Sequence, residues 1–242
     1  MLKQKIFRFP PRNDRRGFTL SEILITLAVM GLVMALTIPS LTQRANKNTY
    51  VAGLKKTYGM LDTATNQIMS NNAGTVIQAF SGSNQAWTKY GTILEFNKTC
   101  WAGSVIGNCW ATSTNKLSGG AAVSFNPENY FGAVLADGSF MLFTIGFPNC
   151  NGTGFSINLP YTSDTDHWCG SIIVDINGFR GPNTFGRDQF LFSLGANGLY
   201  PGGDPHTIYN LVSDDVNCNT TDITHNGYGC ASKVLNEQAM NY

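Results

Sequence analysis

The sequence predicts an α+β fold in which a long N-terminal helix packs on a β-rich globular head with an antiparallel sheet. An apolar run of 22 residues, from residue 18 to residue 39, is followed by a polar stretch that keeps helical periodicity. After residue 130, short alternating apolar segments are separated by turn residues. Only 13% of the residues are charged, and the body is rich in Gly, Asn, Ser, Thr and aromatic residues. This composition is typical of a β-rich extracytoplasmic domain.

The first 17 residues form a basic leader. Six Lys and Arg residues stand there against one acid, Asp14, and removal of the leader leaves ten basic and fourteen acidic residues, a formal charge of −4. The remaining chain lacks the basic stripe that nucleic-acid binding requires. We therefore divide the chain into a leader at 1–17, a transmembrane and assembly helix at 18–72, and a globular head at 73–242.

The apolar run from Phe18 to Pro39 is long enough to cross a bilayer, for which about 20 helical residues suffice. A secretory signal peptide has a shorter apolar core and a small-residue cleavage site after it, and this run has neither. The simplest interpretation is a signal anchor. The basic leader then stays inside and the head lies outside.

Two details go beyond a simple anchor. Glu22 is an acid within the apolar run, where a charge is costly and normally has a partner or a function. The basic leader also ends abruptly at Gly17, directly before Phe18. Cleavage after Gly17 would create a new amino group on Phe18, and the amine of a neighbouring subunit could neutralise Glu22 inside a helix bundle.

The run from Gly17 to Glu22, the apolar stretch and Pro39 together closely resemble the class III signal of type IV pilins and type II secretion pseudopilins. The resemblance implies a pilin-like fold and a prepilin peptidase that cuts after Gly17 and methylates the new N-terminal Phe18. It also implies that Glu22 guides assembly and that Pro39 bends or locally melts the helix. The resemblance covers the N-terminal segment of the chain.

One continuous helix is expected from residue 18 to about residue 70. At 1.5 Å per residue it would be roughly 80 Å long. Its second half carries a stripe at spacings of three and four, which predicts that this face packs on the head. The segment from Asn71 to Gly74 is the expected stop. The stripe consists of Val51, Leu54, Tyr58, Leu61, Thr65 and Ile68.

The head is predicted to contain a hairpin and two later strands. Segments 131–135 and 140–145 flank Asp137-Gly138, which is a strong hairpin signal. Alternating apolar residues predict strands at 171–176 and 190–194, the second ending near Asn197-Gly198. Residues 73–129 are expected to be irregular with short helices or strands, and residues 231–240 to form a short helix.

Six cysteines in an exported chain predict disulfides rather than a metal site, since none forms a CxxC pair. Fifteen pairings are open to six cysteines. The residues fall as three consecutive couples, which favours short-range pairing. The couples are Cys100 with Cys109, Cys150 with Cys169, and Cys218 with Cys230.

The segment from Asp175 to Asp188 collects oxygen donors around a tight glycine turn, and hard cations such as calcium favour oxygen ligands. The side chains of Asp175, Asn177 and Asp188, with a backbone carbonyl near Phe179, are candidate calcium ligands. The alternative is an Asx-turn loop that stabilises only itself.

A second segment, residues 188–198, resembles the late strand and following loop of major pseudopilins, whose loop binds calcium. The match to the acidic ligands of that loop is partial, because Asn197 stands where an acid is often found. Asp204 follows in the later Gly-rich loop.

No nucleophile elbow, phosphate-binding loop or HExxH motif is present, and the three histidines lie in polar loop sequence. We therefore expect no enzymatic activity and no cofactor apart from the candidate calcium. An extracytoplasmic enzyme on a signal anchor remains an alternative without a supporting motif.

The favoured hypothesis is a structural subunit of a type IV pilus or a type II secretion pseudopilus. Its implied partners are a prepilin peptidase, other pilin or pseudopilin subunits and the bacterial inner membrane, which it would cross once, with the head in the periplasm or in a cell-surface fibre. The alternative is a membrane-anchored binding protein or adhesin, such as a minor pilin at a fibre tip. Four tryptophans in the head keep that alternative open, although core packing also explains them. They are Trp87, Trp101, Trp110 and Trp168.

Overall fold

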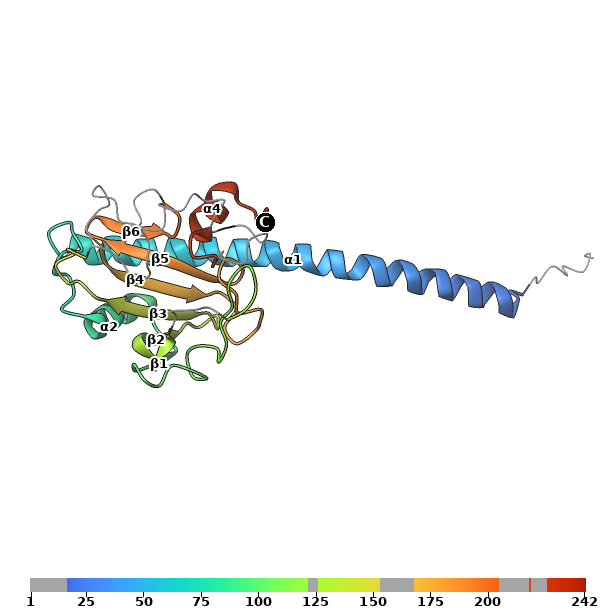
Figure 1. The fold of residues 1–242 in the computed structure, drawn as a ribbon, viewed down its shortest axis with the longest axis horizontal. Helices are drawn as coiled ribbons and strands as arrows, with labels where there is room; N and C mark the ends of the chain where they lie inside the picture. Colours follow the sequence, from blue (N-terminus) through green and yellow to red (C-terminus); the bar gives the residue numbers. More distant parts are fainter. Residues whose placement is uncertain (1–16, 122–125, 153–167, 205–217, 219–225) are drawn as a thin grey trace, which may run out of the picture. The chain divides into compact units, whose positions relative to one another are not determined.

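A computed structural model describes residues 17–121, 126–152, 168–204, 218 and 226–242 (Figure 1). By its contacts the chain forms two units, Met1–Arg44 and Ala45–Tyr242, and we call the second one the head unit. The helix α1 (Leu20–Ser70) begins in the first unit and ends in the second. The predicted α+β fold, with a long N-terminal helix and an antiparallel sheet, is confirmed.

In the first unit, α1 is apolar on every side. Its large side chains are exposed all along the run from Leu20 to Leu41, and an 18-residue window of the helix has a mean hydropathy of 2.2. A helix that is hydrophobic all round requires apolar surroundings. By length and composition α1 can cross a membrane, and no other helix in the described part of the chain meets that criterion.

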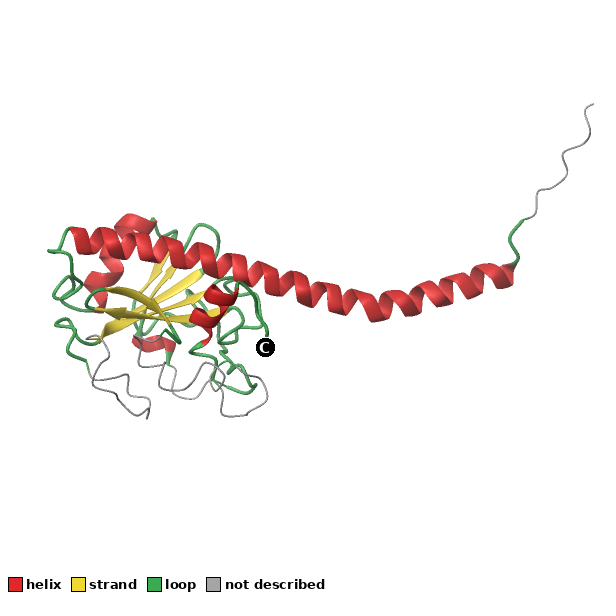
Figure 2. Cartoon of the chain, turned by 90° about the horizontal axis from the view of Figure 1, so that it is seen from above, coloured by secondary structure: helices red, strands yellow, loops and turns green. Residues whose placement is uncertain are grey.

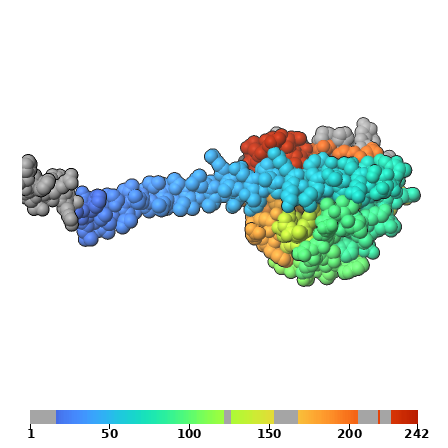
Figure 3. Space-filling view, turned by 180° about the vertical axis from the view of Figure 1, so that it is seen from behind, coloured from blue at the N-terminus to red at the C-terminus, as the bar shows by residue number. Residues whose placement is uncertain are grey.

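In the head unit, α1 buries the stripe that the sequence predicts. Five of its six residues are buried, and the sixth, Tyr58, is half-buried and stacks on Phe192 with ring centroids 5.8 Å apart. Lys55 and Lys56 lie off the stripe and face outward, and the Lys56 Nζ atom lies 2.6 Å from the Asp137 carboxylate. Figure 3 shows this outer side of the helix at the molecular surface.

The sheet has six antiparallel strands whose spatial order equals their order in sequence (Figure 1). The predicted hairpin at Asp137-Gly138 joins the second and third strands, and Gly138 adopts a φ of 85°, which favours glycine. The strands are β1 (Lys98–Cys100), β2 (Phe131–Val134), β3 (Phe140–Ile145), β4 (Trp168–Asp175), β5 (Gln189–Gly195) and β6 (Gly198–Pro201).

Both faces of the sheet are covered. One face packs on α1 and on α2 (Ser83–Leu94), which together form the main core (Figure 2). Within this layer the Tyr90 hydroxyl lies 2.6 Å from the Thr65 hydroxyl and ties α2 to α1. The opposite face buries a second cluster around Trp110, Leu142 and Ile173. Every residue of β4 and β5 is therefore buried.

One part of the head unit differs in detail from the expectation. The chain turns at Asn197 and returns as β6, which pairs with β5, whereas the sequence analysis ends the strand pattern there. β6 is too short to show alternation, since it has only four residues and begins with a glycine. The segment 73–129, expected to be irregular with short elements, contains α2, β1 and the 3₁₀ helix η1 (Pro127–Asn129). The C-terminal helix appears as α4 (Cys230–Glu237).

Three disulfides join the cysteines as consecutive couples, the pairing that the sequence analysis favours. They are Cys100–Cys109, Cys150–Cys169 and Cys218–Cys230. All six cysteines are buried. The covalent links therefore lie within the packed interior of the head unit.

Candidate functional site

The residues around the predicted cleavage point lie directly before α1 and in its first turn. Thr19 precedes the first helical residue, and its side chain accepts a hydrogen bond from the Glu22 backbone N–H at 3.3 Å. The Glu22 carboxylate in turn accepts bonds from the Thr19 backbone N–H at 2.8 Å and from the Thr19 hydroxyl at 2.9 Å. This reciprocal pair is a capping box, which satisfies N–H groups that the first helical turn leaves without a partner.

The capping box places the predicted scissile bond outside the helix. Gly17 and Phe18 precede the first helical turn, and the Phe18 side chain is 83% exposed. A side chain at Gly17 would meet no neighbouring atom within 4 Å. The Gly17–Phe18 peptide is therefore open to a peptidase, and a new amine on Phe18 would lie one helical turn before Glu22.

Glu22 has no cationic partner among the described residues of this single chain. Its charge is held by the two Thr19 donors and lies in the first turn, where the helix dipole favours an anion. The sequence analysis names Glu22 but misses Thr19. The spacing Thr-x-x-Glu at the start of an apolar helix is the signal that predicts this residue.

Pro39 lies inside α1, and the helix continues through it. Proline has no N–H to bond the carbonyl of Ala35, so the helix loses one internal hydrogen bond there. Threonine hydroxyls on both sides of Pro39 also bond to backbone carbonyls of the helix: Thr37 donates to Val33 and Thr42 to Pro39, each at 2.9 Å.

The candidate calcium ligands fall on the loop between β4 and β5. The Asp175 carboxylate accepts bonds from the backbone N–H groups of Asn177 at 3.2 Å and Gly178 at 2.9 Å, and from Gln189 Nε2 at 2.9 Å. The Asp188 carboxylate accepts bonds from two backbone N–H groups, at 2.8 Å from residue 183 and at 2.7 Å from residue 184. The bonds of Asp175 to the following residues are those of an Asx turn, whereas Asp188 bonds back to residues earlier in the same loop.

Both carboxylates are buried. Burial and then the nearby charge of Asp188 raise the pKa of Asp175 to about 8, and burial raises the pKa of Asp188. The Phe179 side chain is 56% exposed and packs edge-on against Phe140. Within the described residues, no three His, Cys, Asp or Glu side chains are grouped to hold a metal ion. The three histidines lie outside the described residues.

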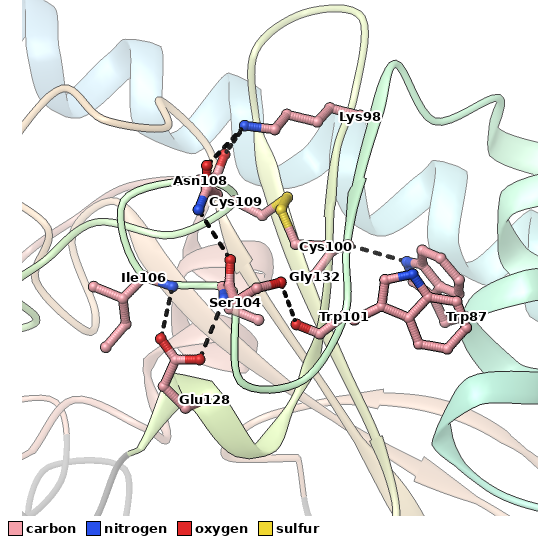
Figure 4. The surroundings of a disulfide bond; sticks show 11 residues. Trp87, Lys98, Cys100, Trp101, Ser104, Ile106, Asn108, Cys109, Glu128 and Gly132 are labelled. Atoms are coloured by element: carbon pink, nitrogen blue, oxygen red, sulfur yellow. Dashed lines mark hydrogen bonds between the residues drawn. A yellow bond between two sulfur atoms is a disulfide. The ribbon is translucent and has the colours of Figure 1, made fainter.

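A second site stands on the loop that the Cys100–Cys109 disulfide closes (Figure 4). Trp101 is 58% exposed and contacts Trp87 and Phe131, with ring centroids 5.4 and 5.6 Å away. The Glu128 carboxylate accepts hydrogen bonds from the backbone N–H groups of residues 105 and 106 at 3.3 and 3.1 Å. The loop is thus fixed at both ends and in the middle, and it presents one indole at the surface.

The other tryptophans are packed rather than displayed. Trp110 and Trp168 are buried, and Trp87 is half-buried and donates through Nε1 to the Gly132 carbonyl at 3.0 Å. Core packing therefore accounts for three of the four tryptophans that the sequence analysis singles out.

The comparison with protein families places these N-terminal residues in a known class. Residues 12–38 match the family model of the prokaryotic N-terminal methylation motif. Proteins of this class, the pilins and pseudopilins, are typically structural subunits rather than enzymes. The chain thus carries a prepilin-type cleavage and methylation motif on an apolar helix. No solved structure matches the chain.

Proposed function

We propose that this chain is a structural subunit of a type IV pilus or a type II secretion pseudopilus. A prepilin peptidase cleaves it after Gly17 and methylates Phe18, and the mature helix then anchors the subunit in the inner membrane, with the head on the extracytoplasmic side. Subunits assemble through α1, where the amine of one Phe18 neutralises Glu22 of a neighbour. Pro39 provides the point at which the helix bends or locally melts when the subunit enters the fibre.

One observation carries this proposal. The apolar part of α1 is exposed on all sides, yet it begins with a capped acid directly after an accessible glycine junction. A membrane anchor requires only the apolar surface. A helix that leaves the bilayer to pack among copies of itself also requires a group that fixes the register, and a buried ion pair serves that purpose.

The first prediction concerns the mature N-terminus. Mass spectrometry of the N-terminal peptide from membrane-extracted protein is expected to show a chain that begins at Phe18 and carries one methyl group. The physical reason is the position of the Gly17–Phe18 bond outside the capped helix, where a peptidase can engage it. A peptide that begins at Met1, or one that begins at or beyond residue 29, contradicts the proposal.

A second candidate function, adhesion at a fibre tip, is supported by Trp101. Aromatic side chains that stand exposed on a rigid loop are frequent anchors of binding surfaces. The disulfide and the Glu128 bonds hold this loop without any ligand. Little conformational entropy is therefore lost when Trp101 binds a partner.

The Trp101→Ala variant separates the two functions. If the chain is an adhesin that binds through Trp101, cells that assemble this variant are expected to lose at least about half of their adhesion to the surface that wild-type cells bind. Subunit content in sheared fibres, measured by immunoblot, is expected to stay at the wild-type level. Ile77→Ala, a change at another exposed apolar residue, is the matched control. Unchanged adhesion of the Trp101 variant would exclude adhesion through Trp101 and leave only the structural function.

A further inference from the structure

The outer side of α1 in the head unit carries two charges, Lys55 and Asp62, that form no ion pair in the described part of the chain (Figure 3). We propose that this side of the helix binds a second copy of the chain, with Lys55 of one subunit paired to Asp62 of the next. The contact rests on the fibre function proposed above, and it joins the heads of neighbouring subunits in addition to their apolar helices.

The first observation is how the charges on this part of α1 are used. The helix carries four charged residues within the head unit. Two of them bond within the chain: Lys47 donates to two backbone carbonyls of the C-terminal segment at 2.9 and 3.1 Å, and Lys56 Nζ lies 2.6 Å from the Asp137 carboxylate. Lys55 is exposed and bonds to none of the described residues. Among these residues, the Asp62 carboxylate is bonded only by a neutral side-chain amide, at 3.2 Å.

The second observation is where the two remaining charges lie on the helix. They are seven positions apart, which places them on the same side of α1 and about 10 Å apart along its axis. Side chains of one helix pair at spacings of three or four residues, so Lys55 and Asp62 of the same chain are not neighbours. Both charges are therefore open to a partner outside the chain, and the two have opposite signs.

The third observation is the residue between them. Gly59 lies in the interior of α1 and is exposed, and a side chain at this position would meet no atom within 4 Å. Glycine destabilises a helix interior relative to alanine, and no packing within the described head unit requires it here. Because glycine lets a second backbone come close, it leaves room for another helix between the two charges.

Opposite charges on one side of a helix are complementary to a second copy of the same helix. A parallel copy that is shifted along the axis by about two helical turns places its Asp62 beside Lys55 of the first subunit. The other two charges stay free for further copies, so this contact is heterologous and open-ended. An antiparallel copy would form both ion pairs at once and close as a dimer. Helices that enter one membrane in one orientation are parallel, which favours the open-ended contact.

Carbodiimide cross-linking of sheared fibres tests the contact, because this reagent joins an amine and a carboxylate only where they touch. Lys56 and Asp137, which pair within one chain, are the internal positive control. Mass spectrometry is expected to find the Lys55–Asp62 cross-link in gel bands of two, three and more subunits. A cross-link found only in the monomer, or one that stops at the dimer, overturns the contact. Its absence where the Lys56–Asp137 cross-link is present also overturns it.

Charge reversal provides the second test. A single exposed ion pair is weak, but the contact recurs at every subunit, and reversal of one charge brings like charges together. Lys55→Glu and Asp62→Lys are each expected to lower the ratio of subunit in fibres to subunit in membranes by about fivefold or more. The double variant Lys55→Glu/Asp62→Lys restores the pair with exchanged signs and is expected to regain most of the wild-type ratio.

Lys56→Glu is the matched control, because it makes the same charge change at the next residue, whose partner Asp137 lies in its own chain. It is expected to keep at least about half of the wild-type ratio. Equal losses in Lys55→Glu and Lys56→Glu overturn the contact, as does a double variant that assembles no better than either single variant. Failure of the fibre function is distinguishable: in that case the wild-type chain itself is absent from fibres, whereas wild-type levels of Lys55→Glu in fibres overturn the contact alone.

Discussion

Replacing Glu22 by Ala is expected to remove this subunit from fibres while leaving it in the membrane. Without the carboxylate, the apolar run of α1 has no charge and inserts at least as well as the wild-type helix. In a packed bundle of such helices, however, the neighbouring Phe18 amine loses its partner and remains as an uncompensated charge in apolar surroundings. We expect the amount of subunit in sheared fibres to fall by about tenfold or more, at an unchanged amount in the membrane fraction.

Two further variants distinguish the effect of the Glu22 charge on assembly from the effect of the capping box. Glu22→Gln keeps an oxygen that can accept the Thr19 bonds but removes the charge, so assembly is expected to fail as in Glu22→Ala. Thr19→Ala removes the reciprocal bonds and keeps the charge, so assembly is expected to persist at reduced yield. Immunoblots of membrane and fibre fractions measure both. Wild-type fibre content in the Glu22→Gln variant would exclude an ion pair at this position.

The double variant Cys150→Ala/Cys169→Ala is expected to have the largest effect on the stability of the head unit. The disulfide closes a loop with a sequence separation of 19, and both cysteines are buried in the main core under α1 and α2. Loss of a cross-link of this length costs about 3 kcal/mol in the chain-entropy model. For a domain of this size, that corresponds to a fall in Tm of about 6–12 °C.

The measurement is a melting curve of the full chain in detergent, followed by tryptophan fluorescence. Alkylation of the unfolded wild-type protein without reductant is the control, and it is expected to label no cysteine. Labelled thiols at residue 150 or 169, or equal Tm values for the double variant and the wild type, would show that this cross-link does not stabilise the fold.

Elements with a strict period or a strong turn signal could be predicted from the sequence. The stripe on α1 recurs at spacings of three and four through 18 residues, from Val51 to Ile68, and Asp137-Gly138 marks its hairpin without ambiguity. By contrast, α2 buries only Ala86 and Tyr90, and its preceding residue, Gly82, makes no side-chain cap. A helix with two buried positions and no cap leaves almost no periodic signal.

The candidate sites divide in the same way. The processing junction is local, since Gly17, Phe18 and Glu22 are near neighbours in the chain, and the sequence names all three. The loop around Trp101 depends on residues that lie far apart in the chain. Glu128 bonds the backbone of residues 105 and 106, and Trp101 contacts Trp87 and Phe131, so no local sequence pattern specifies this site.

The stripe on α1 has a consequence for the timing of folding. Residues 51–68 are synthesised before any of the strands that cover them, and Lys47 bonds to the carbonyls of Met240 and Tyr242, which follow 193 and 195 positions later. Such long separations in sequence slow folding, because distant segments must meet before their contacts form. The apolar stripe therefore stays uncovered until the strands that pack on it have been made. During that interval the exposed stripe makes the incomplete chain prone to aggregation.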